Sequence, residues 1–143
     1  MGSFQIEADG GARGNPGPAA YGAVVLDEAG IVRHLAGALG IATNNVAEYT
    51  ALVVALEWIA EHLGDDHTVD VRLDSKLVVE QMSGNWKIKH PDMRTLAVRA
   101  RNAYPATLVT YAWVPREQNK RADALVNEIL DDGTPGLVIN RAP

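Results

Sequence analysis

The chain has 143 residues, of which 47% are hydrophobic and 22% charged, so it is long enough for one globular domain with a single core. It contains no cysteine, which excludes disulfides and thiolate zinc sites, and its longest apolar run is too short to span a bilayer. The net charge of −5 is unfavourable for binding nucleic acid, because phosphates usually meet a basic surface. Basic residues nevertheless gather in two stretches, 87–101 and 116–121.

The N-terminal part of the chain predicts three strands followed by a long helix. Residues 4–9 alternate apolar and polar side chains, and apolar runs follow at residues 21–26 and 31–39. Because the connections are short, these strands should form an antiparallel meander. In the segment TNNVAEYTALVVALEWIAEHLG the apolar side chains recur at helical spacing, and Gly64 is a suitable stop.

The rest of the chain predicts strands that alternate with helices. Strands are expected at residues 68–74 and 107–114, and helices at residues 75–82, 92–104 and 120–130. A strand, a helix and a strand that return to one sheet form a right-handed crossover, in which the two strands are parallel. The predicted fold class is therefore α/β, with a five-stranded mixed sheet and helices on both faces.

The two ends of the chain carry weaker signals. The first five residues lack a basic stretch followed by an apolar one, so we expect no signal peptide and a cytoplasmic protein. Residues 134–143 contain Pro135, Gly136 and Pro143, and are predicted to be a loose tail or a linker stub. The predicted domain therefore covers residues 1–133.

Four carboxylates stand at the ends of predicted elements, namely Asp9, Glu48, Asp74 and Asp123. Taken singly, Asp9 suits a turn, and Glu48 suits a capping box that begins at Asn45. Asp74 likewise suits a helix N-cap, and Asp123 suits the dipole of a helix start. These separate structural roles do not explain why the topology brings all four acids to one edge of the sheet. Open α/β sheets place their active sites at that edge. Crowded carboxylates need cations, and Mg²⁺ prefers such ligands.

Four segments resemble the signatures of type 1 ribonuclease H, in order and at compatible spacing: ADGGARGNPGPAAYGAVV, TNNVAEYTALVVALEWI, VRLDSKLVVEQMSGNWK and VPREQNKRADALVNEIL. That family cuts the RNA strand of RNA/DNA hybrids with four acidic residues and two magnesium ions. The resemblance therefore implies a ribonuclease H-like fold and an endonuclease that leaves 5′-phosphate and 3′-hydroxyl ends. Its catalytic and metal-binding acids would be Asp9, Glu48, Asp74 and Asp123, with Mn²⁺ able to replace Mg²⁺.

The resemblance also implies contacts to the minor groove of the hybrid. Gly10, Gly11 and Asn15 lie in a glycine-rich segment whose backbone can approach a wide, shallow groove. Asn44 and Asn45 match positions that touch the same groove, although they could equally cap the helix. Glu48 matches the family residue that binds metal and also accepts a hydrogen bond from a 2′-hydroxyl.

Further matches concern the DNA strand and the phosphates. Thr43 resembles a contact to a DNA phosphate, with Asn85 as a second contact. Trp86 matches a position that stacks on a deoxyribose, and a place in the core is the alternative. Lys76 follows the third acid at a position where relatives often have glutamine, and Lys87 is expected to meet phosphates.

The chain departs from the family pattern in two places. Many bacterial relatives carry an extra basic helix after Trp86, whereas here only KIKHPD precedes the next helix, as in a compact subgroup. Hybrid binding should therefore be weaker and sensitive to salt. Many relatives also have a histidine in the loop that follows residues 107–114, and here PREQNKRAD has none. Arg116 could neutralise charge on phosphate in its place, Glu117 could attract metal, or both could form surface ion pairs.

Three other functions fit less well. A magnesium phosphatase that forms an aspartyl-phosphate would need an acid two residues after Asp9, where Gly11 stands. The TNNVAEY segment argues against a junction resolvase on the same fold. A non-catalytic hybrid-binding module would have no reason to keep four carboxylates that repel one another. We expect a monomer that binds an RNA/DNA hybrid and no membrane, with a possible fused C-terminal domain, as in some relatives of the compact type.

Overall fold

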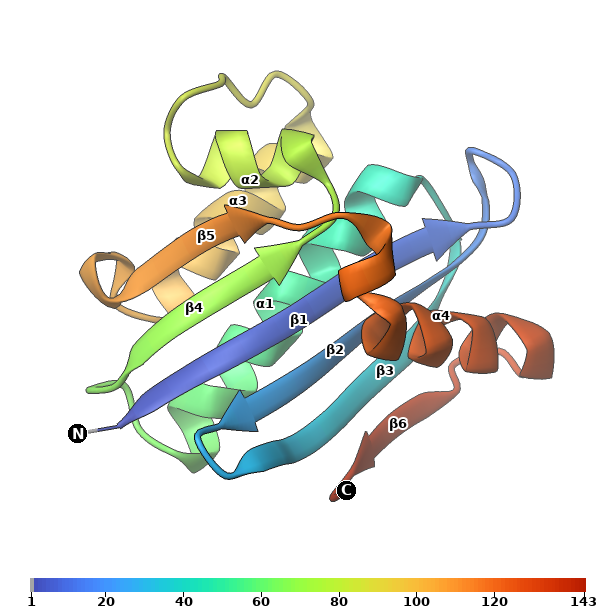
Figure 1. The fold of residues 1–143 in the computed structure, drawn as a ribbon. Helices are drawn as coiled ribbons and strands as arrows, with labels where there is room; N and C mark the ends of the chain where they lie inside the picture. Colours follow the sequence, from blue (N-terminus) through green and yellow to red (C-terminus); the bar gives the residue numbers. More distant parts are fainter. Residues whose placement is uncertain (1) are drawn as a thin grey trace.

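A six-stranded mixed sheet forms the centre of the computed structural model, which describes residues 2–143 (Figure 1). The strands are β1 (Ser3–Ala12), β2 (Gly17–Asp27), β3 (Gly30–Ala42), β4 (Thr68–Leu73), β5 (Val109–Trp113) and β6 (Val138–Arg141), in the order β5-β4-β1-β2-β3-β6. β1, β2 and β3 form the predicted antiparallel meander, and β4 pairs in parallel with both β1 and β5. The α/β class and the mixed sheet are therefore confirmed.

The prediction of five strands is wrong, because the sheet has six. β6 pairs antiparallel with β3, from His34 opposite Arg141 to Gly37 opposite Val138. It lies within residues 134–143, where the sequence analysis expects a tail. A strand of four residues is too short to show a periodic pattern, and it forms here because the edge of β3 offers unpaired backbone groups.

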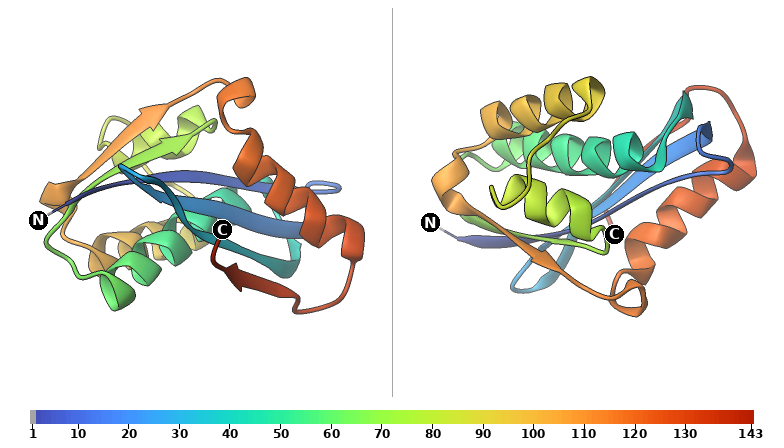
Figure 2. Two further views of the ribbon diagram at one scale, coloured as in Figure 1. Left: turned by 60° about the horizontal axis from the view of Figure 1, so that its bottom comes forward. Right: turned by 90° about the horizontal axis from the view of Figure 1, so that it is seen from above.

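Helices cover both faces of the sheet, as predicted (Figure 2). The helices are α1 (Asn44–His62), α2 (Lys76–Met82), α3 (Pro91–Ala103) and α4 (Lys120–Asp132). α1, α2 and α3 share one core on one face, and α4 packs alone on the opposite face over β1, β2 and β3. Within the described part of the chain, no helix combines the length and the hydropathy that crossing a membrane requires.

The local sequence explains where the two long helices begin and end. α1 starts after Thr43, whose Oγ1 accepts a hydrogen bond from the Val46 amide, and it stops before Gly64, whose φ of 93° is left-handed. α4 buries Leu125, Val126 and Ile129, which share one face of the helix. The caps therefore set the ends of α1, and the apolar residues of α4 set the side that it turns toward the sheet.

β1 and β2 run further than their apolar patterns predict. The ladder continues through Gly10 opposite Tyr21 to Ala12 opposite Ala19, so Asp9 lies inside β1 and does not end it, contrary to the sequence analysis. The parallel ladder between β1 and β4 does end here, since its last pair is Ala8 and Leu73. Asp9 and Asp74 each follow a member of that pair, and the two aspartates consequently stand side by side.

Candidate active site

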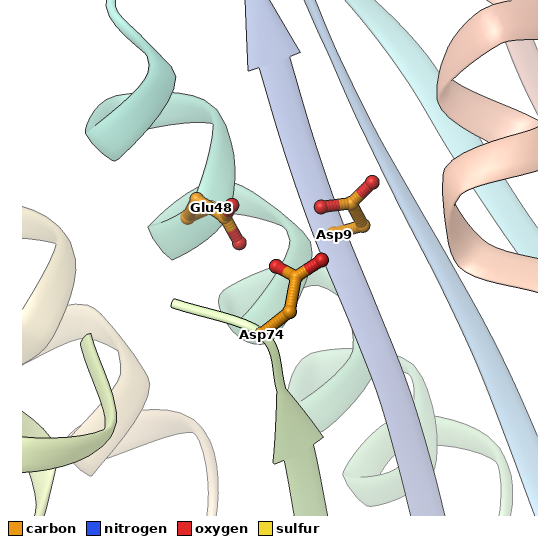
Figure 3. Close-up of side chains that lie close together, drawn as sticks. All are labelled: Asp9, Glu48 and Asp74. Carbon is orange, nitrogen blue, oxygen red and sulfur yellow. The ribbon is translucent and has the colours of Figure 1, made fainter. Parts of the chain in front are cut away.

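Three carboxylates converge where β1 and β4 part (Figure 3). One carboxylate oxygen each from Asp9, Glu48 and Asp74 lie within 4.8 Å of one another. Asp9 comes from β1, Glu48 from the second turn of α1, and Asp74 from the residue after β4. Asp9 is 6% exposed and Glu48 is 8% exposed, so these two charges lie in a largely dry environment.

The environment raises the pKa of all three carboxyls. Burial is the main cause at Asp9, and the nearby charges of Asp74 and Asp123 add to it, so that its pKa reaches about 8. Burial, followed by the charges of Asp9 and Asp74, also raises the pKa of Glu48 well above its usual value. Burial raises the pKa of Asp74 as well, while Arg116 opposes this shift. The shifts therefore reflect burial first and, at Asp9 and Glu48, the repulsion between neighbouring carboxylates second.

Two glycines allow the helices that carry Glu48 and Asp123 to approach the sheet. A Cβ on Gly10 would overlap the backbone of α1 at Ala47 and Glu48. A Cβ on Gly22, which pairs with Asp9 across the sheet, would lie 2.7 Å from the carbonyl oxygen of Ala122. Gly10 and Gly22 therefore let α1 and α4 bring their carboxylates next to Asp9 from opposite faces.

Asp123, the fourth predicted acid, completes the lining of a cleft of about 290 Å³. We call this the acidic cleft, and its walls include Asp9, Gly10, Gly11, Asn44, Glu48, Asp74, Arg116 and Asp123. Asp123 lies in the first turn of α4, so its predicted role at a helix start is compatible with a place in the cleft.

The structural explanations for the other three acids fail. Thr43 is the N-cap of α1, so Glu48 is not part of a capping box that begins at Asn45. Ser75 caps α2 by accepting from the Val78 amide, which leaves the side chain of Asp74 free of that task. Asp9 occupies a strand and not a turn.

The donor set fits a divalent cation. Oε2 of Glu48 is buried and has no hydrogen-bond partner among the described residues, which is unusual for a buried oxygen. Carboxylate oxygens are the ligands that Mg²⁺ and Mn²⁺ prefer, and a cation where they converge would offset their repulsion. Asp9, Glu48 and Asp74 are therefore the residues best placed to hold one.

Two residues that no sequence pattern singled out donate to main-chain carbonyls next to the aspartates, one at Asp74 and one at Ala8. Nε1 of Trp113 donates to the carbonyl oxygen of Asp74 at 3.1 Å. Asn119 is fully buried, donates from Nδ2 to the carbonyl oxygen of Ala8 at 2.8 Å, and helps to keep the pKa of Asp74 from rising further. Their distance from Asp74 in the sequence, 39 and 45 residues, hides both roles from a local pattern.

Arg116 and Glu117, the two alternatives for the missing loop histidine, occupy different places. Arg116 is exposed, lines the acidic cleft and acts on Asp74 and Glu48 through its charge. Glu117 is exposed and does not line the cleft. The geometry thus favours Arg116 as the group that would face a bound phosphate.

Two of the predicted minor-groove residues, Asn15 and Asn44, form a hydrogen-bonded network at the rim of the cleft. Oδ1 of Asn44 accepts from the Ala12 amide at 2.7 Å, and Oδ1 of Asn15 accepts from the Asn44 amide at 3.1 Å. Backbone amides can only donate, so each asparagine turns its acceptor inward and keeps its Nδ2 donors for other partners. Asn45 is the neighbouring residue of α1 and points to a different surface.

A second, open groove of about 690 Å³ contains most of the residues predicted to meet the DNA strand. We call it the tryptophan groove, and it is lined by Asn45, Gln81, Asn85, Trp86, Lys87, Lys89 and His90, among others. Trp86 is 46% exposed, so the alternative of a core position is wrong. Nδ2 of Asn85 donates to Glu80, whereas Lys76 is exposed at the start of α2 and Thr43 caps α1, both outside the groove.

Comparison with known proteins identifies the family. A family model described as Reverse transcriptase-like matches residues 7–129. The bifunctional protein Rv2228c of Mycobacterium tuberculosis is 52% identical over 141 residues, which cover 96% of this chain and 38% of that protein. Ribonuclease HI of Halobacterium salinarum is 48% identical over 128 residues, which cover 87% of this chain and 62% of that protein. The chain thus spans less than two thirds of the length of these curated relatives.

Solved structures agree with this assignment. RNase H1 from Halobacterium salinarum superposes with a TM-score of 0.85 at 46% identity, covering 92% of this chain and all of that one (100%). LC11-RNase H1 in complex with an RNA/DNA hybrid superposes with a TM-score of 0.83 at 41% identity, covering 90% of this chain and 97% of that one. The chain therefore belongs to the type 1 ribonuclease H family.

Proposed function

We propose that this chain is a metal-dependent endonuclease that hydrolyses the RNA strand of RNA/DNA hybrids and leaves 5′-phosphate and 3′-hydroxyl ends. The observation that carries the proposal is the convergence of three carboxylates within 4.8 Å, one of them with an unpartnered buried oxygen. LC11-RNase H1, which shares the fold at 41% identity, was solved in complex with an RNA/DNA hybrid, and this supports the hybrid as substrate.

Asp9, Glu48, Asp74 and Asp123 would hold two Mg²⁺ ions, which Mn²⁺ could replace. Such ions, when bound, supply an activated water for attack on phosphorus and stabilise the leaving oxygen. The chain's own part is to position the backbone that carries the carboxylates. Gly10 and Gly22 admit α1 and α4, and Trp113 and Asn119 donate to main-chain carbonyls at the ends of the paired strands. Arg116 would neutralise charge on the reacting phosphate.

Asn15 and Asn44 would read the minor groove as donors only. Both use Oδ1 to accept from the backbone, which leaves Nδ2 to donate to purine N3 or pyrimidine O2 atoms. Every base pair offers such acceptors in the minor groove, so these contacts would tolerate any sequence. Gly10 and Gly11, which also line the cleft, would let the backbone approach the sugars. Glu48 would accept from a 2′-hydroxyl and so select an RNA strand.

The tryptophan groove would hold the DNA strand. Trp86 would stack on a deoxyribose, and Asn45, Asn85 and Lys87 line the same groove. Thr43 accepts from an amide with its hydroxyl oxygen, and its hydroxyl hydrogen stays free to donate to a phosphate. Lys76 would add a positive charge near the reacting strand.

The remaining expectations stay part of the proposal. Residues 1–133 would form the catalytic unit, because all four acids lie within them. β6 is an edge strand of the sheet, and two strands separate it from β1. The absence of cysteine fits a reducing compartment such as the cytoplasm. A monomer and a further domain after residue 143 are also proposed, the latter because a relative is called bifunctional and is longer than this chain.

A cleavage assay tests the proposal directly. The protein is incubated with end-labelled RNA/DNA hybrid, duplex DNA and duplex RNA, with Mg²⁺, with Mn²⁺ and with a chelator. We expect cleavage of the RNA strand of the hybrid with either metal, and product ends that a DNA or RNA polymerase can extend. Equal cleavage of duplex DNA, or full activity in chelator, would overturn the proposal.

A further inference from the structure

Arg13 lies within the first signature segment and lines the acidic cleft, and the sequence analysis assigns it no role. It follows the last residue of β1 and stands two residues before Asn15. Among the described residues that line the cleft, Arg13 and Arg116 are the two that carry a positive charge. The cleft otherwise presents four carboxylates, so a polyanionic substrate needs such cations at its edges.

The backbone around Arg13 is held firmly. The Arg13 amide donates to the carbonyl oxygen of Pro18 at 2.8 Å, across the turn that joins β1 to β2. The preceding residue, Ala12, donates to Asn44 Oδ1 at 2.7 Å. Arg13 is therefore fixed at its Cα next to the asparagine network, and only its long side chain is able to change direction.

The side chain of Arg13 pairs with Asp131 near the end of α4. The distance from Nη2 to Oδ1 is 2.5 Å, and the two side chains are 50% and 69% exposed. Figure 2 shows the turn between β1 and β2 beside this end of α4. Exposed ion pairs contribute little to stability, so a competing anion can replace the partner. A guanidinium matches the geometry of a phosphate, with which it forms paired hydrogen bonds.

We propose that Arg13 binds a backbone phosphate of the hybrid and leaves Asp131 in order to do so. Asp131 then acts as an internal competitor that weakens hybrid binding. This inference rests on the proposed function, because it takes the hybrid as the ligand of the cleft. It adds a phosphate contact and a restraint on affinity that the acidic residues and the asparagines do not supply.

The test measures binding of a labelled RNA/DNA hybrid in chelator over a series of salt concentrations. Arg13→Gln should weaken binding about three- to tenfold and reduce the slope of log affinity against log salt by about 1. Asp131→Asn should tighten binding by about two- to fivefold, the range of an exposed ion pair. In the double variant the gain from Asp131→Asn should disappear, because Arg13 is no longer there to be released.

The same helix provides a matched control. Arg141 and Glu128 form an exposed pair between β6 and α4, with side chains 52% and 48% exposed, and neither lines the cleft. Arg141→Gln and Glu128→Gln make the same charge changes, and should alter affinity by less than about twofold. If Arg13→Gln matches Arg141→Gln, or if Asp131→Asn tightens binding equally without Arg13, the proposal is wrong.

Cleavage by the wild type, measured in parallel with Mg²⁺, separates the two proposals. If the wild type cleaves the hybrid but Arg13→Gln changes binding no more than Arg141→Gln does, only the proposed role of Arg13 is wrong. Binding that responds to Arg13 and Asp131 as expected, without cleavage, overturns the proposed function alone. A wild-type protein that does not bind the hybrid overturns both. Thermal melting of each variant establishes that it is folded.

Discussion

The acidic cleft and the tryptophan groove meet at the first turn of α1, where Asn44 lines the cleft and Asn45 lines the groove. They are built in different ways. The cleft depends on backbone contacts, since α1 packs on Gly10 and α4 packs on Gly22 without room for a side chain. The groove is walled by long, exposed side chains such as Trp86 and Lys87.

This difference indicates that the cleft would control the rate of hydrolysis and the groove would control hybrid binding. Buried carboxylates in a dry site interact strongly, so their geometry decides whether chemistry occurs. Each exposed cation contributes a small binding free energy that salt screens. We therefore expect changes in the cleft to act on the rate of hydrolysis, and changes in the groove to act on affinity and on its salt dependence.

The largest effect should follow from Asp74→Asn. Loss of a metal-binding carboxylate should reduce the hydrolysis rate by at least about a hundredfold, the equivalent of several kcal/mol of transition-state stabilisation. The variant should melt at the same temperature as the wild type or higher in chelator, because one repelling charge is gone. Asp70→Asn on the same strand is the control, since Asp70 pairs with Arg72 away from the cleft. A wild-type rate, or a much lower melting temperature, would contradict the assignment.

The next largest effect should follow from removing the 2′-hydroxyl that Glu48 is proposed to bind. A hydrogen bond to a charged group contributes about 1.5–3 kcal/mol, so removing its 2′-hydroxyl partner should slow cleavage at one position by about ten- to a hundredfold. The measurement is single-turnover cleavage of hybrids in which one 2′-deoxy unit is moved along the RNA strand. A flat profile would show that the shape of the duplex, and not Glu48, selects RNA.

The pKa of Asp9 predicts how the metal-free protein responds to pH. Its pKa is about 8 in the folded state against a usual 3.8, so the folded state binds the proton more tightly. The free energy of unfolding in chelator should therefore fall as the pH rises from about 4 to about 8. Asp9→Asn should lose this component, and denaturant titrations of both proteins across that range measure it. Parallel stability curves for the two proteins would exclude the effect.

Lys87 should give the smallest effect, and one confined to binding. Lys87→Gln should weaken hybrid binding by about two- to fivefold and reduce the salt slope by about 1, while turnover at saturating hybrid stays within about twofold. Anisotropy titrations and saturation kinetics measure the two quantities, with Arg141→Gln as the control for net charge. A large loss of turnover would mean that the groove also positions the reacting strand. The assignment of rate to the cleft and of affinity to the groove would then be wrong.

Much of the fold could be predicted because its signals are local. The meander and the four helices follow from period-two and helical patterns and from turn residues. The prediction that the first strand ends at Asp9 is wrong, since Gly10 and Gly11 continue β1 and pair with Tyr21 and Ala20. Glycine signals a turn when taken alone, and only the approach of α1 shows why it is needed within a strand.

The amino-acid sequence alone identified the chemical groups that are available, namely four acids and the signature segments of a nuclease family. Only the tertiary structure decided which oxygens converge, and it added Trp113, Asn119 and Arg13 to the site. The ion pair of Arg13 with Asp131 joins residues 118 positions apart. Local periodicity reports which face of an element is apolar, whereas contacts of this kind depend on how separate elements pack, and packing is set by the whole chain at once.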